Sequence, residues 1–370
     1  MIDSVLKKSR SGAELSRGEL VSLLSITDTA ELRSLYDCAY FVKERHVGKR
    51  TYFRGIIECG NICVKDCYYC GIRKSNNEVE RFLMDEDEIF REAIWTYEAD
   101  YGSCVIQSAE RTDNGYIAMI ERVVSRIKEA TEGKLGITLS LGEQTEKTYR
   151  RWFKAGAHRY LLRVETTNPA LYARIHPADH LLEERKKCLA ALRRVGYQVG
   201  TGMMIGLPGQ TVEDLANDVL YLKEIDIDMV GMGPYIPHRG TPMGWALPPY
   251  SDEQKAASLQ LGLKMIAVTR IVLRDINIAA ATALQALEYT GREQGLRCGA
   301  NVIMPNVTAA QFRQQYQLYD DKPCTDENSL MCRGCLSGRI RGIGETVGFG
   351  EWGDSPHFKK RSATKGAGDE

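Results

Sequence analysis

The chain has 370 residues, 43% of them hydrophobic, and its 49 lysines and arginines balance its 49 aspartates and glutamates. This neutral balance gives no electrostatic basis for binding nucleic acid or an anionic membrane. No apolar run approaches the ~20 residues of a membrane-spanning helix, and residues 1–10 lack the apolar core of a signal peptide. With an odd number of cysteines, 11, the chain is predicted to be cytoplasmic and to form no disulfide framework.

Short apolar segments alternate with amphipathic segments along most of the chain, after a helical lead-in. The predicted strands are 54–59, 103–108, 136–141, 159–165, 198–205, 229–235, 276–282 and 301–304. The predicted helices lie near 85–100, 115–131, 145–155, 181–195, 211–225 and 251–273. This alternation predicts an α/β fold of parallel βαβ units, and eight strands would close a complete or nearly complete (β/α)8 TIM-type barrel. An open doubly wound sheet is the alternative.

The chain divides into four predicted segments. Residues 1–48 form a helical N-terminal lead-in, and residues 49–306 form the barrel. Residues 307–350 form an irregular closing segment that carries a second group of cysteines. Residues 351–370 form a polar tail, of which we expect residues 361–370 to be frayed.

Three cysteines, Cys63, Cys67 and Cys70, stand in the loop directly after the first predicted strand. Their spacing supplies three thiolates, which leaves a four-iron cluster with one iron free of a protein ligand. A zinc site would require four ligands in paired groups, and the nearest histidine, His46, belongs to another segment. Cys59 falls within the strand itself, where the pleat directs its side chain, so it is left out of the cluster.

Polar side chains alternate with apolar ones on two neighbouring strands. Thr138 lies on the polar face of strand 136–141, and Arg163 and Glu165 share one side of strand 159–165. These faces should look into the barrel, where a buried charge requires a ligand or a partner. A structural pairing of Arg163 with Glu165 is the alternative to a ligand-binding role.

Residues 200–210 form an apolar strand that contains several glycines, and Thr211 follows as the cap of the next helix. Such a strand could lie under an adenine or cradle a phosphate. The segment lacks the lysine and the spacing of a phosphate-binding P-loop, so the glycines alone indicate little about the ligand.

The cysteine spacing, with Tyr69 before the last cysteine and Gly71 after it, resembles the cluster loop of the radical S-adenosylmethionine (SAM) superfamily. The resemblance implies a 4Fe–4S cluster whose open iron binds the methionine moiety of SAM. It also implies that an electron from the cluster cleaves SAM to a 5'-deoxyadenosyl radical, the reactive species, so no side chain is assigned as catalytic.

Residues 50–336 resemble, in one register, the HydE family of radical enzymes, which helps to build the active-site cluster of FeFe-hydrogenases. Segments 159–169, 228–234 and 297–306 carry much of this resemblance. It implies a small sulfur-containing or organometallic cysteine–iron substrate, other maturation proteins and an electron donor as partners, and a monomer. The biotin synthase and methylornithine synthase families are the enzymatic alternatives. A non-catalytic iron–sulfur carrier is the alternative of another class.

Family roles transfer to individual positions of this chain. The residues implied to bind SAM are Tyr69, Ser108, Glu110, Glu165, Arg185, Gly202, Ile205 and Gly206. The residues implied to line the substrate side are Thr138, Arg163, Met304, Tyr316 and Tyr319. Ser108 and Ala109 stand where the superfamily often has two glycines, and Met204 stands where its pattern has isoleucine.

A second cysteine group, Cys324, Cys332 and Cys335, lies near the C-terminus. In the HydE family this region can hold an auxiliary iron–sulfur cluster, so the resemblance implies a second cluster here. A zinc site without its fourth ligand and unligated thiols remain open alternatives. The remaining cysteines have no partner at ligand spacing and are predicted to be buried small hydrophobes: Cys38, Cys104, Cys188 and Cys298.

Overall fold

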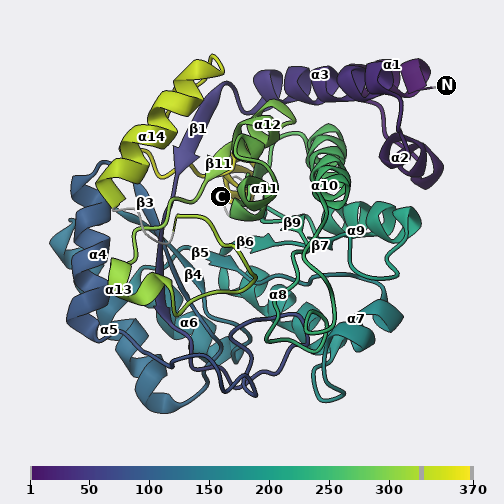
Figure 1. Ribbon diagram of the computed structural model, residues 1–370. Helices are drawn as coiled ribbons and strands as arrows, with labels where there is room; N and C mark the ends of the chain where they lie inside the picture. Colours follow the sequence, from purple (N-terminus) through teal and green to yellow (C-terminus); the bar gives the residue numbers. More distant parts are fainter. Residues whose placement is uncertain (1, 325–328, 367–370) are drawn as a thin grey trace.

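The computed structural model describes residues 2–324 and 329–366, and it describes only the backbone of residues 329–332, 365 and 366 (Figure 1). Three helices precede the barrel: α1 (Ile2–Ser11), α2 (Arg17–Leu24) and α3 (Thr29–His46). Ser16 and Glu19 form a capping box on α2, and the Asp28 carboxylate accepts hydrogen bonds from the first amides of α3. The predicted helical lead-in is therefore present.

Seven parallel strands form one continuous sheet in the order β10-β8-β6-β5-β4-β3-β2. They are β2 (Gly55–Gly60), β3 (Ser103–Ser108), β4 (Gly136–Ser140), β5 (Arg159–Leu161), β6 (Gln198–Thr201), β8 (Met229–Val230) and β10 (Asn277–Ile278). A short pair, β7 (Met204–Ile205) and β9 (Gly233–Pro234), follows β6 and β8. Each strand begins within a few residues of its predicted start.

An eighth strand position joins the two edges of this sheet. β11 (Val302–Ile303) pairs with β1 (Arg50–Phe53), which leads directly into β2. Isolated bridges connect Ala279 to Val302 on one side and Ile56 to Asn306 on the other. The barrel is therefore closed, so the predicted TIM-type fold is confirmed and the open doubly wound alternative is wrong.

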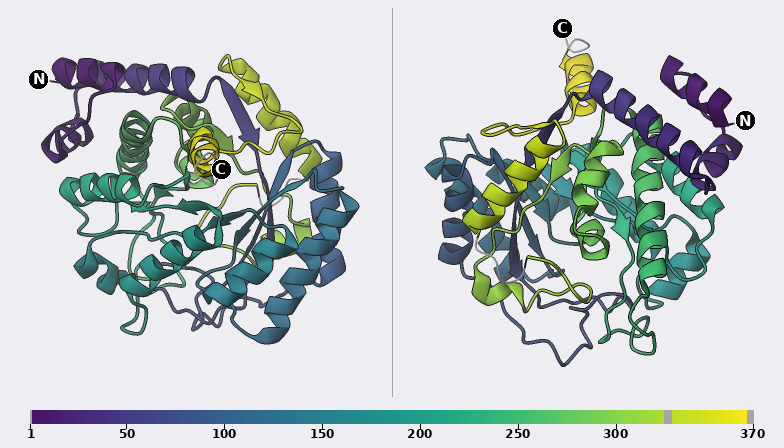
Figure 2. Two further views of the ribbon diagram at one scale, coloured as in Figure 1. Left: turned by 180° about the vertical axis from the view of Figure 1, so that it is seen from behind. Right: turned by 45° about the horizontal axis from the view of Figure 1, so that its top comes forward.

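Helices cover the outside of the ring (Figures 1 and 2). They are α4 (Glu86–Glu98), α5 (Asn114–Ala130), α6 (Glu146–Ala155), α7 (Pro169–Ile175), α8 (Leu182–Val195), α9 (Val212–Glu224), α10 (Asp252–Leu273), α11 (Thr282–Leu287) and α12 (Gly291–Arg297). Side-chain caps begin several of them, as Asp85, Thr145 and Ser251 do for α4, α6 and α10. The short α7, which begins at Pro169, was not predicted because it is only 7 residues long.

One helix in the described part of the chain, α10, is long and apolar enough to cross a membrane by length and composition alone. It instead packs against α2, α3, α9 and α11 as part of the core. Lys264 donates a hydrogen bond to the Ile26 carbonyl at 3.1 Å, and Arg270 donates to the Gly299 carbonyl at 2.8 Å. These buried cations bond to neighbouring protein backbone, as expected of a helix that is part of a protein core.

The C-terminal region is more regular than predicted. It contains α13 (Ala310–Arg313), α14 (Ser329–Gly342), β12 (Thr346–Val347) and α15 (Pro356–Gly366). The expectation of a frayed tail is wrong for residues 361–366, because they belong to α15, which docks on the end of the barrel opposite the loop that follows β2 (Figure 2). Local composition gave no sign of this, since the contacts that hold α15 come from distant residues.

Ion pairs hold α15 in place, with His357 at their centre. Its Nε2 lies 2.6 Å from Asp226 Oδ1, and its Nδ1 lies 3.2 Å from Asp275 Oδ1. Lys360 and Arg361 of the same helix also pair with these two carboxylates, at 2.7 and 2.9 Å. Hydrogen bonds to Asp275 and Asp226 raise the pKa of His357 above its usual value.

We expect α15 to be held less tightly as the pH rises. A pKa raised on folding adds stability that is complete below the unfolded-state pKa and is lost as the pH rises through the folded-state value. His357→Gln should lower the free energy of unfolding at pH 6 by about 1 kcal/mol and have a smaller effect at pH 8. Urea denaturation at both pH values checks this. Lys359→Gln, on the same helix, is the control, and an equal loss at both pH values would contradict the account.

Candidate active site

The loop that carries the three cysteines follows β2, and three other parts of the chain hold its backbone. The Val64 amide donates to the Glu110 carbonyl at 3.0 Å, beyond the end of β3. The Tyr68 amide donates to the carbonyl of Ile175, the last residue of α7, at 3.0 Å, and the Gly71 amide donates to the carbonyl of Leu318 at 3.1 Å. The loop is thus fixed over the carboxyl ends of the strands, where barrel enzymes place their chemistry.

Cys63, Cys67 and Cys70 are all partly buried in this loop. Burial raises the pKa of Cys67 to about 12, and burial together with the neighbouring Cys67 and Cys63 raises that of Cys70 further. The three thiols are therefore close enough to influence one another, and they would stay protonated at neutral pH without a cation to displace their protons. Their chemistry suits a metal cluster.

No group of three His, Cys, Asp or Glu side chains in the described residues converges as a single metal ion requires. A cubane cluster makes a different demand, because each thiolate binds a separate iron atom. Three soft thiolates on one loop, without a fourth ligand, fit a 4Fe–4S cluster with one open iron better than a zinc site. Cys59 is fully buried in the core, as its position in the strand predicted.

Two histidines that sequence reasoning missed lie beside the cysteine loop. His180 Nδ1 is 4.0 Å from Cys67 Sγ, and His176 Nε2 is 3.4 Å from the Tyr69 hydroxyl. His176 Nδ1 is 3.0 Å from the Tyr172 carbonyl, which can only accept, so Nε2 is left to accept from Tyr69. Burial lowers the pKa of His176 to about 3, so this histidine is neutral. The sequence feature that could have revealed these residues is the presence of two histidines four residues apart just before α8.

A chain of alternating charges runs beside the cysteines. Arg185 Nε donates to Glu143 Oε1 at 2.6 Å, and Lys65 Nζ lies 2.7 Å from Glu143 Oε2 and 3.5 Å from Glu110 Oε1. Burial alone would lower the pKa of Lys65, but Glu110 and Glu143 outweigh this effect and raise it. The predicted residues Glu110 and Arg185 thus stand at the two ends of one network, a carboxylate and a guanidinium.

Arg163 and Glu165 form the structural pair that was the alternative in the sequence. Arg163 Nη2 donates to Glu165 Oε2 at 2.9 Å and to the Met203 carbonyl at 3.0 Å. Glu165 has a φ of 67°, a left-handed conformation that is uncommon for a residue other than glycine. Its second carboxylate oxygen makes no contact with Arg163, so the pairing and a ligand-binding role are compatible.

Close packing explains why glycine occupies key positions in the segment of residues 200–210, called here the glycine strand. A Cβ at Gly202 would overlap the carbonyl oxygen of Gly231, so only glycine lets the two strand ends approach so closely. Gly206 has a φ of 80°, and its amide donates to Gln210 Oε1 at 2.7 Å. Gln210 Nε2 in turn donates to the Met204 carbonyl at 3.1 Å. Gln210 thus holds the backbone on both sides of Ile205, and the space beside Gly206 is open.

Ser108 is the predicted site residue that the structure does not bring to the site. Its hydroxyl contacts the Tyr116 hydroxyl on α5 and donates to the Ala109 carbonyl at 2.6 Å. The preceding residue, Gln107, instead points to Tyr316, with its Nε2 3.4 Å from the phenol oxygen. Because side chains alternate along a strand, the inward position of β3 belongs to Gln107.

Polar groups line the rest of the barrel interior. Thr138 is 1% exposed, and its Oγ1 has no hydrogen-bond partner among the described residues. Tyr316 is buried, and its carbonyl accepts from Lys322 Nζ at 2.9 Å. Lys322 also forms an ion pair with Glu58, a pair that sequence reasoning missed because its members are far apart in the chain. The unsatisfied hydroxyl suits a polar ligand.

Tyr319 and Met304, the other two predicted substrate residues, are partly buried. Burial raises the pKa of Tyr319, and the nearby charges that affect it include Arg163 and Glu58. Tyr319 therefore lies near the charged groups of the barrel interior. Residues 316–319 are not helical, so the two tyrosines share this region through a turn instead of a helix face.

The second cysteine group is only partly described. Cys324 has a φ of 65°, and its Sγ lies 3.9 Å from Arg292 Nη2 and 4.0 Å from Gln285 Nε2. Cys335 is exposed, and the side chain of Cys332 lies outside the described residues. An auxiliary cluster at this group therefore stays a prediction.

Comparison with known proteins decides the family. Residues 57–222 match the model of the radical SAM superfamily. Over 92% of its length the chain is 42% identical to the FeFe hydrogenase maturase subunit HydE of Thermotoga maritima, 94% of which is covered. The chain belongs to the HydE family of radical SAM enzymes. This family carries a 4Fe–4S cluster and SAM, and the donor set of Cys63, Cys67 and Cys70 fits that cluster.

Other members of the superfamily are more distant from this HydE family member. Biotin synthase of Mycobacterium leprae is 27% identical over 79% of this chain and 82% of its own length. The crystal structure of methylornithine synthase (PylB) has a TM-score of 0.79 and 22% identity, over 94% of this chain and 98% of that one. The second likeness shows the shared barrel fold.

Gly71 provides a test of how tightly the cluster loop is packed. A Cβ at this position would overlap the carbonyl oxygen of Gln317 and the imidazole of His238. Gly71→Ala should therefore displace the loop and lower the iron content of the anaerobically reconstituted protein at least about tenfold, because all three thiolates must be placed together. Iron and sulfide analysis checks this.

Gly18→Ala is the matched control, since a Cβ there would meet no atom within 4 Å and its backbone, like that of Gly71, lies outside the left-handed region. Full iron content in both variants would contradict the packing argument.

Proposed function

We propose that this chain cleaves SAM reductively and directs the 5'-deoxyadenosyl radical at a small substrate inside the barrel, during assembly of the di-iron unit of FeFe-hydrogenase. The single observation that carries the proposal is 42% identity to a HydE across nearly the whole length of both chains. The three thiols on one loop and the polar barrel interior supply the two parts that such a reaction needs.

The charged network suggests how SAM is held. The methionine end of SAM carries an ammonium and a carboxylate, and Glu110 and Arg185 offer the opposite charges at two ends of one network. Both groups already have protein partners, Lys65 and Glu143, which orient them before the ligand arrives. Burial raises the pKa of Glu110, so the ammonium group of the ligand would favour its charged form. Binding would add to these pairs without leaving a buried charge alone.

The nucleoside end has separate partners in this proposal. Glu165 would accept hydrogen bonds from the ribose hydroxyls, for which its carboxylate offers two acceptor oxygens. The adenine would lie against the strand from Gly202 to Gly206, beside Ile205 and Gly206. A Cβ at Gly206 would meet no atom within 4 Å, so a flat ring has room to approach there, whereas Gly202 would shape the strand end through its close contact with Gly231. Tyr69, fixed by His176, would close this side of the pocket.

The substrate would lie deeper, between the cluster loop and the middle of the barrel. Thr138 offers an unsatisfied hydroxyl, and Arg163, Met304, Tyr316 and Tyr319 offer charge, a soft apolar surface and two phenols. This mixture suits a compact substrate with sulfur and polar groups, such as a cysteine bound to an iron carrying small ligands. When bound, the cluster supplies the electron that generates the radical from SAM.

Two competing functions are less well supported. The sequences of enzymes that insert sulfur, such as biotin synthase, or that rearrange a carbon skeleton, such as methylornithine synthase, are only 27% and 25% identical to this chain. An iron–sulfur carrier would need the cysteines but neither the network of Arg185 and Glu110 nor the glycine strand. The buried polar groups would then carry a desolvation cost without a ligand to offset it.

The proposal extends to partners and location. A second iron–sulfur cluster at Cys324, Cys332 and Cys335 would be auxiliary, because the first cluster already has its three ligands. An electron donor must reduce the first cluster, and other hydrogenase maturation proteins must supply the substrate and receive the product. We propose a monomeric, cytoplasmic enzyme.

Cleavage of SAM tests the reaction type. The reconstituted chain with dithionite should produce 5'-deoxyadenosine, and replacement of Cys63, Cys67 and Cys70 by alanine should reduce this at least about a hundredfold, since the cluster is lost. Anaerobic liquid chromatography measures the product. Cys38→Ala, which changes a buried thiol on α3 that contacts the Leu6 carbonyl, is the control and should cleave SAM normally. Retained cleavage in the triple variant would sink the proposal.

Complementation tests the substrate and the biological role. The chain should restore FeFe-hydrogenase activity, measured as hydrogen evolution, in a host whose own HydE gene is deleted. Glu165→Gln should lower the restored activity by about tenfold or more through weaker SAM binding. Production of 5'-deoxyadenosine without any restored hydrogenase activity would favour a different substrate, and turnover of dethiobiotin would identify a biotin synthase.

A further inference from the structure

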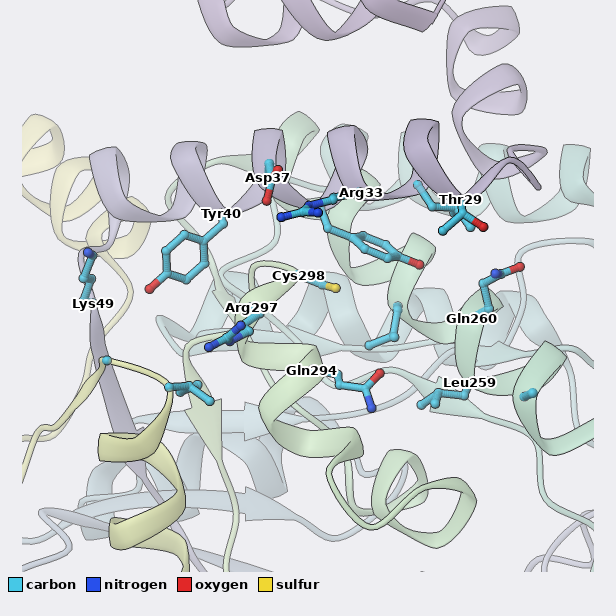
Figure 3. A pocket seen from close by; sticks show the side chains of 16 residues that line it. Thr29, Arg33, Asp37, Tyr40, Lys49, Leu259, Gln260, Gln294, Arg297 and Cys298 are labelled. Atoms are coloured by element: carbon cyan, nitrogen blue, oxygen red, sulfur yellow. The ribbon is translucent and has the colours of Figure 1, made fainter. Parts of the chain in front are cut away.

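A cavity of about 880 Å³ lies at the end of the barrel opposite the cluster loop (Figure 3). Its walls come from α3, α10 and α12, together with Lys49 just before β1 and with Ile343 and Gly344 after α14. Lys49 and Cys298 precede strands β1 and β11, whereas the cluster loop follows β2. We call this cavity the α3–α12 pocket. It takes no part in the site described above.

The inner wall of the α3–α12 pocket is apolar. Leu32 and Leu263 are each 6% exposed, and Leu259 completes this wall from α10. Tyr36 and Tyr40 lie one turn apart on α3, and both line the cavity. Cavities of roughly 300–1,000 Å³ with mainly apolar walls are the usual form of small-molecule sites. The size and the two rings suit a flat apolar body.

Positive charge gathers around the same pocket. Arg33 on α3, Arg297 at the end of α12 and Lys49 all line it, against one acidic residue, Asp37. Lys49 is already paired, with its Nζ 2.7 Å from Glu44 Oε1. Within the part of the chain that the structure describes, Arg33 and Arg297 have neither a hydrogen bond nor an ion pair from their guanidinium groups.

Arg33 and Arg297 line the same cavity from two different helices. Arg33 projects from α3 towards the cavity, and Arg297 lies on the far wall beside Gln294 (Figure 3). Two uncommitted guanidinium groups from different elements thus flank one apolar space. A guanidinium presents a planar fork of donors that matches a carboxylate or a phosphate.

We propose that the α3–α12 pocket binds a small organic anion with a flat apolar body. The body lies against Tyr36, Tyr40 and Leu259, and its carboxylate or phosphate lies between Arg33 and Arg297. The concave form of the site favours a small molecule over the surface of an acidic protein, because the apolar wall lies inside the cavity. The ligand is neither SAM nor the radical substrate, whose groups lie at the other end of the barrel.

Calorimetry with the reconstituted holoenzyme tests this with three probes: 2-naphthyl phosphate, 2-naphthol and inorganic phosphate. The first has both features of the proposed ligand, and each of the others has one. We expect one molecule of 2-naphthyl phosphate per chain, bound at least about tenfold more tightly than either other probe, because one charged contact is worth that much.

Two variants locate the binding. Arg33→Gln combined with Arg297→Gln removes the charges, and Leu259→Trp fills the cavity while keeping them. Each should weaken 2-naphthyl phosphate binding by about tenfold or more. Arg17→Gln is the matched control, because Arg17 is an exposed arginine on α2 that bonds Asn217 at 2.7 Å and does not line the pocket. All variants should cleave SAM at the wild-type rate.

The outcomes are decisive in both directions. Equal affinity in the double arginine variant and the wild type, or no binding by the wild type at about 1 mM probe, would overturn the proposal. Tight binding of 2-naphthol alone would also overturn it, since it would show an apolar cavity without anion recognition. If Leu259→Trp fails to fold by circular dichroism, the arginine variant decides the result.

Discussion

The need to keep charges paired inside a closed barrel governs the candidate site. A single buried charge costs several kcal/mol of desolvation, and three buried or partly buried cations at the site have a carboxylate close to them. Arg163 pairs with Glu165, and Arg185 pairs with Glu143. Lys322, from the C-terminal segment, pairs with Glu58. These pairs are electrically balanced without a ligand, yet they still offer both signs of charge at fixed positions.

This balance suits a ligand whose amino-acid end is zwitterionic, as in SAM. An ammonium and a carboxylate together add no net charge, so they can join the network of Glu110, Lys65, Glu143 and Arg185 without breaking a pair. A single charged group placed there would leave that network unbalanced. The same network lies beside the cysteine loop, because the Val64 amide of that loop bonds to the Glu110 carbonyl. Cluster placement and charge placement are therefore coupled through one short stretch of chain.

Much of the fold could be predicted because local sequence patterns determine where its strands and helices begin. The strand and helix starts follow hydrophobic periodicity and caps such as Asp85, Thr145 and Ser251. The cysteine loop follows from spacing alone. In contrast, Lys322 meets Glu58 across 264 positions, and no local signal relates them. His176 and His180 were visible as a pair, but only the tertiary fold brings them to Cys67 and Tyr69.

Ser108 shows a different limit of sequence reasoning. Its position at the end of β3 was correct, but the side chain of the last strand residue can face either way. The pleat turns it to Tyr116 and gives the inward position to Gln107. Transfer of a role by sequence position therefore predicts where the backbone lies more reliably than where the side chain points. Glu165 differs, because its left-handed backbone and its bond to Arg163 fix the side chain independently.

The floor of the barrel completes the conditions for radical chemistry. Residues 352–354 close it: Arg54 and Asn277 both donate to the Gly353 carbonyl, at 3.0 and 2.8 Å, and Arg159 donates to the Trp352 carbonyl at 2.6 Å. These donors come from the starts of β2, β5 and β10, so one short segment holds several strands together. A reactive radical survives only where water and stray side chains are excluded. This part of the segment that was predicted to be a polar tail thus closes the end of the barrel opposite the cysteine loop.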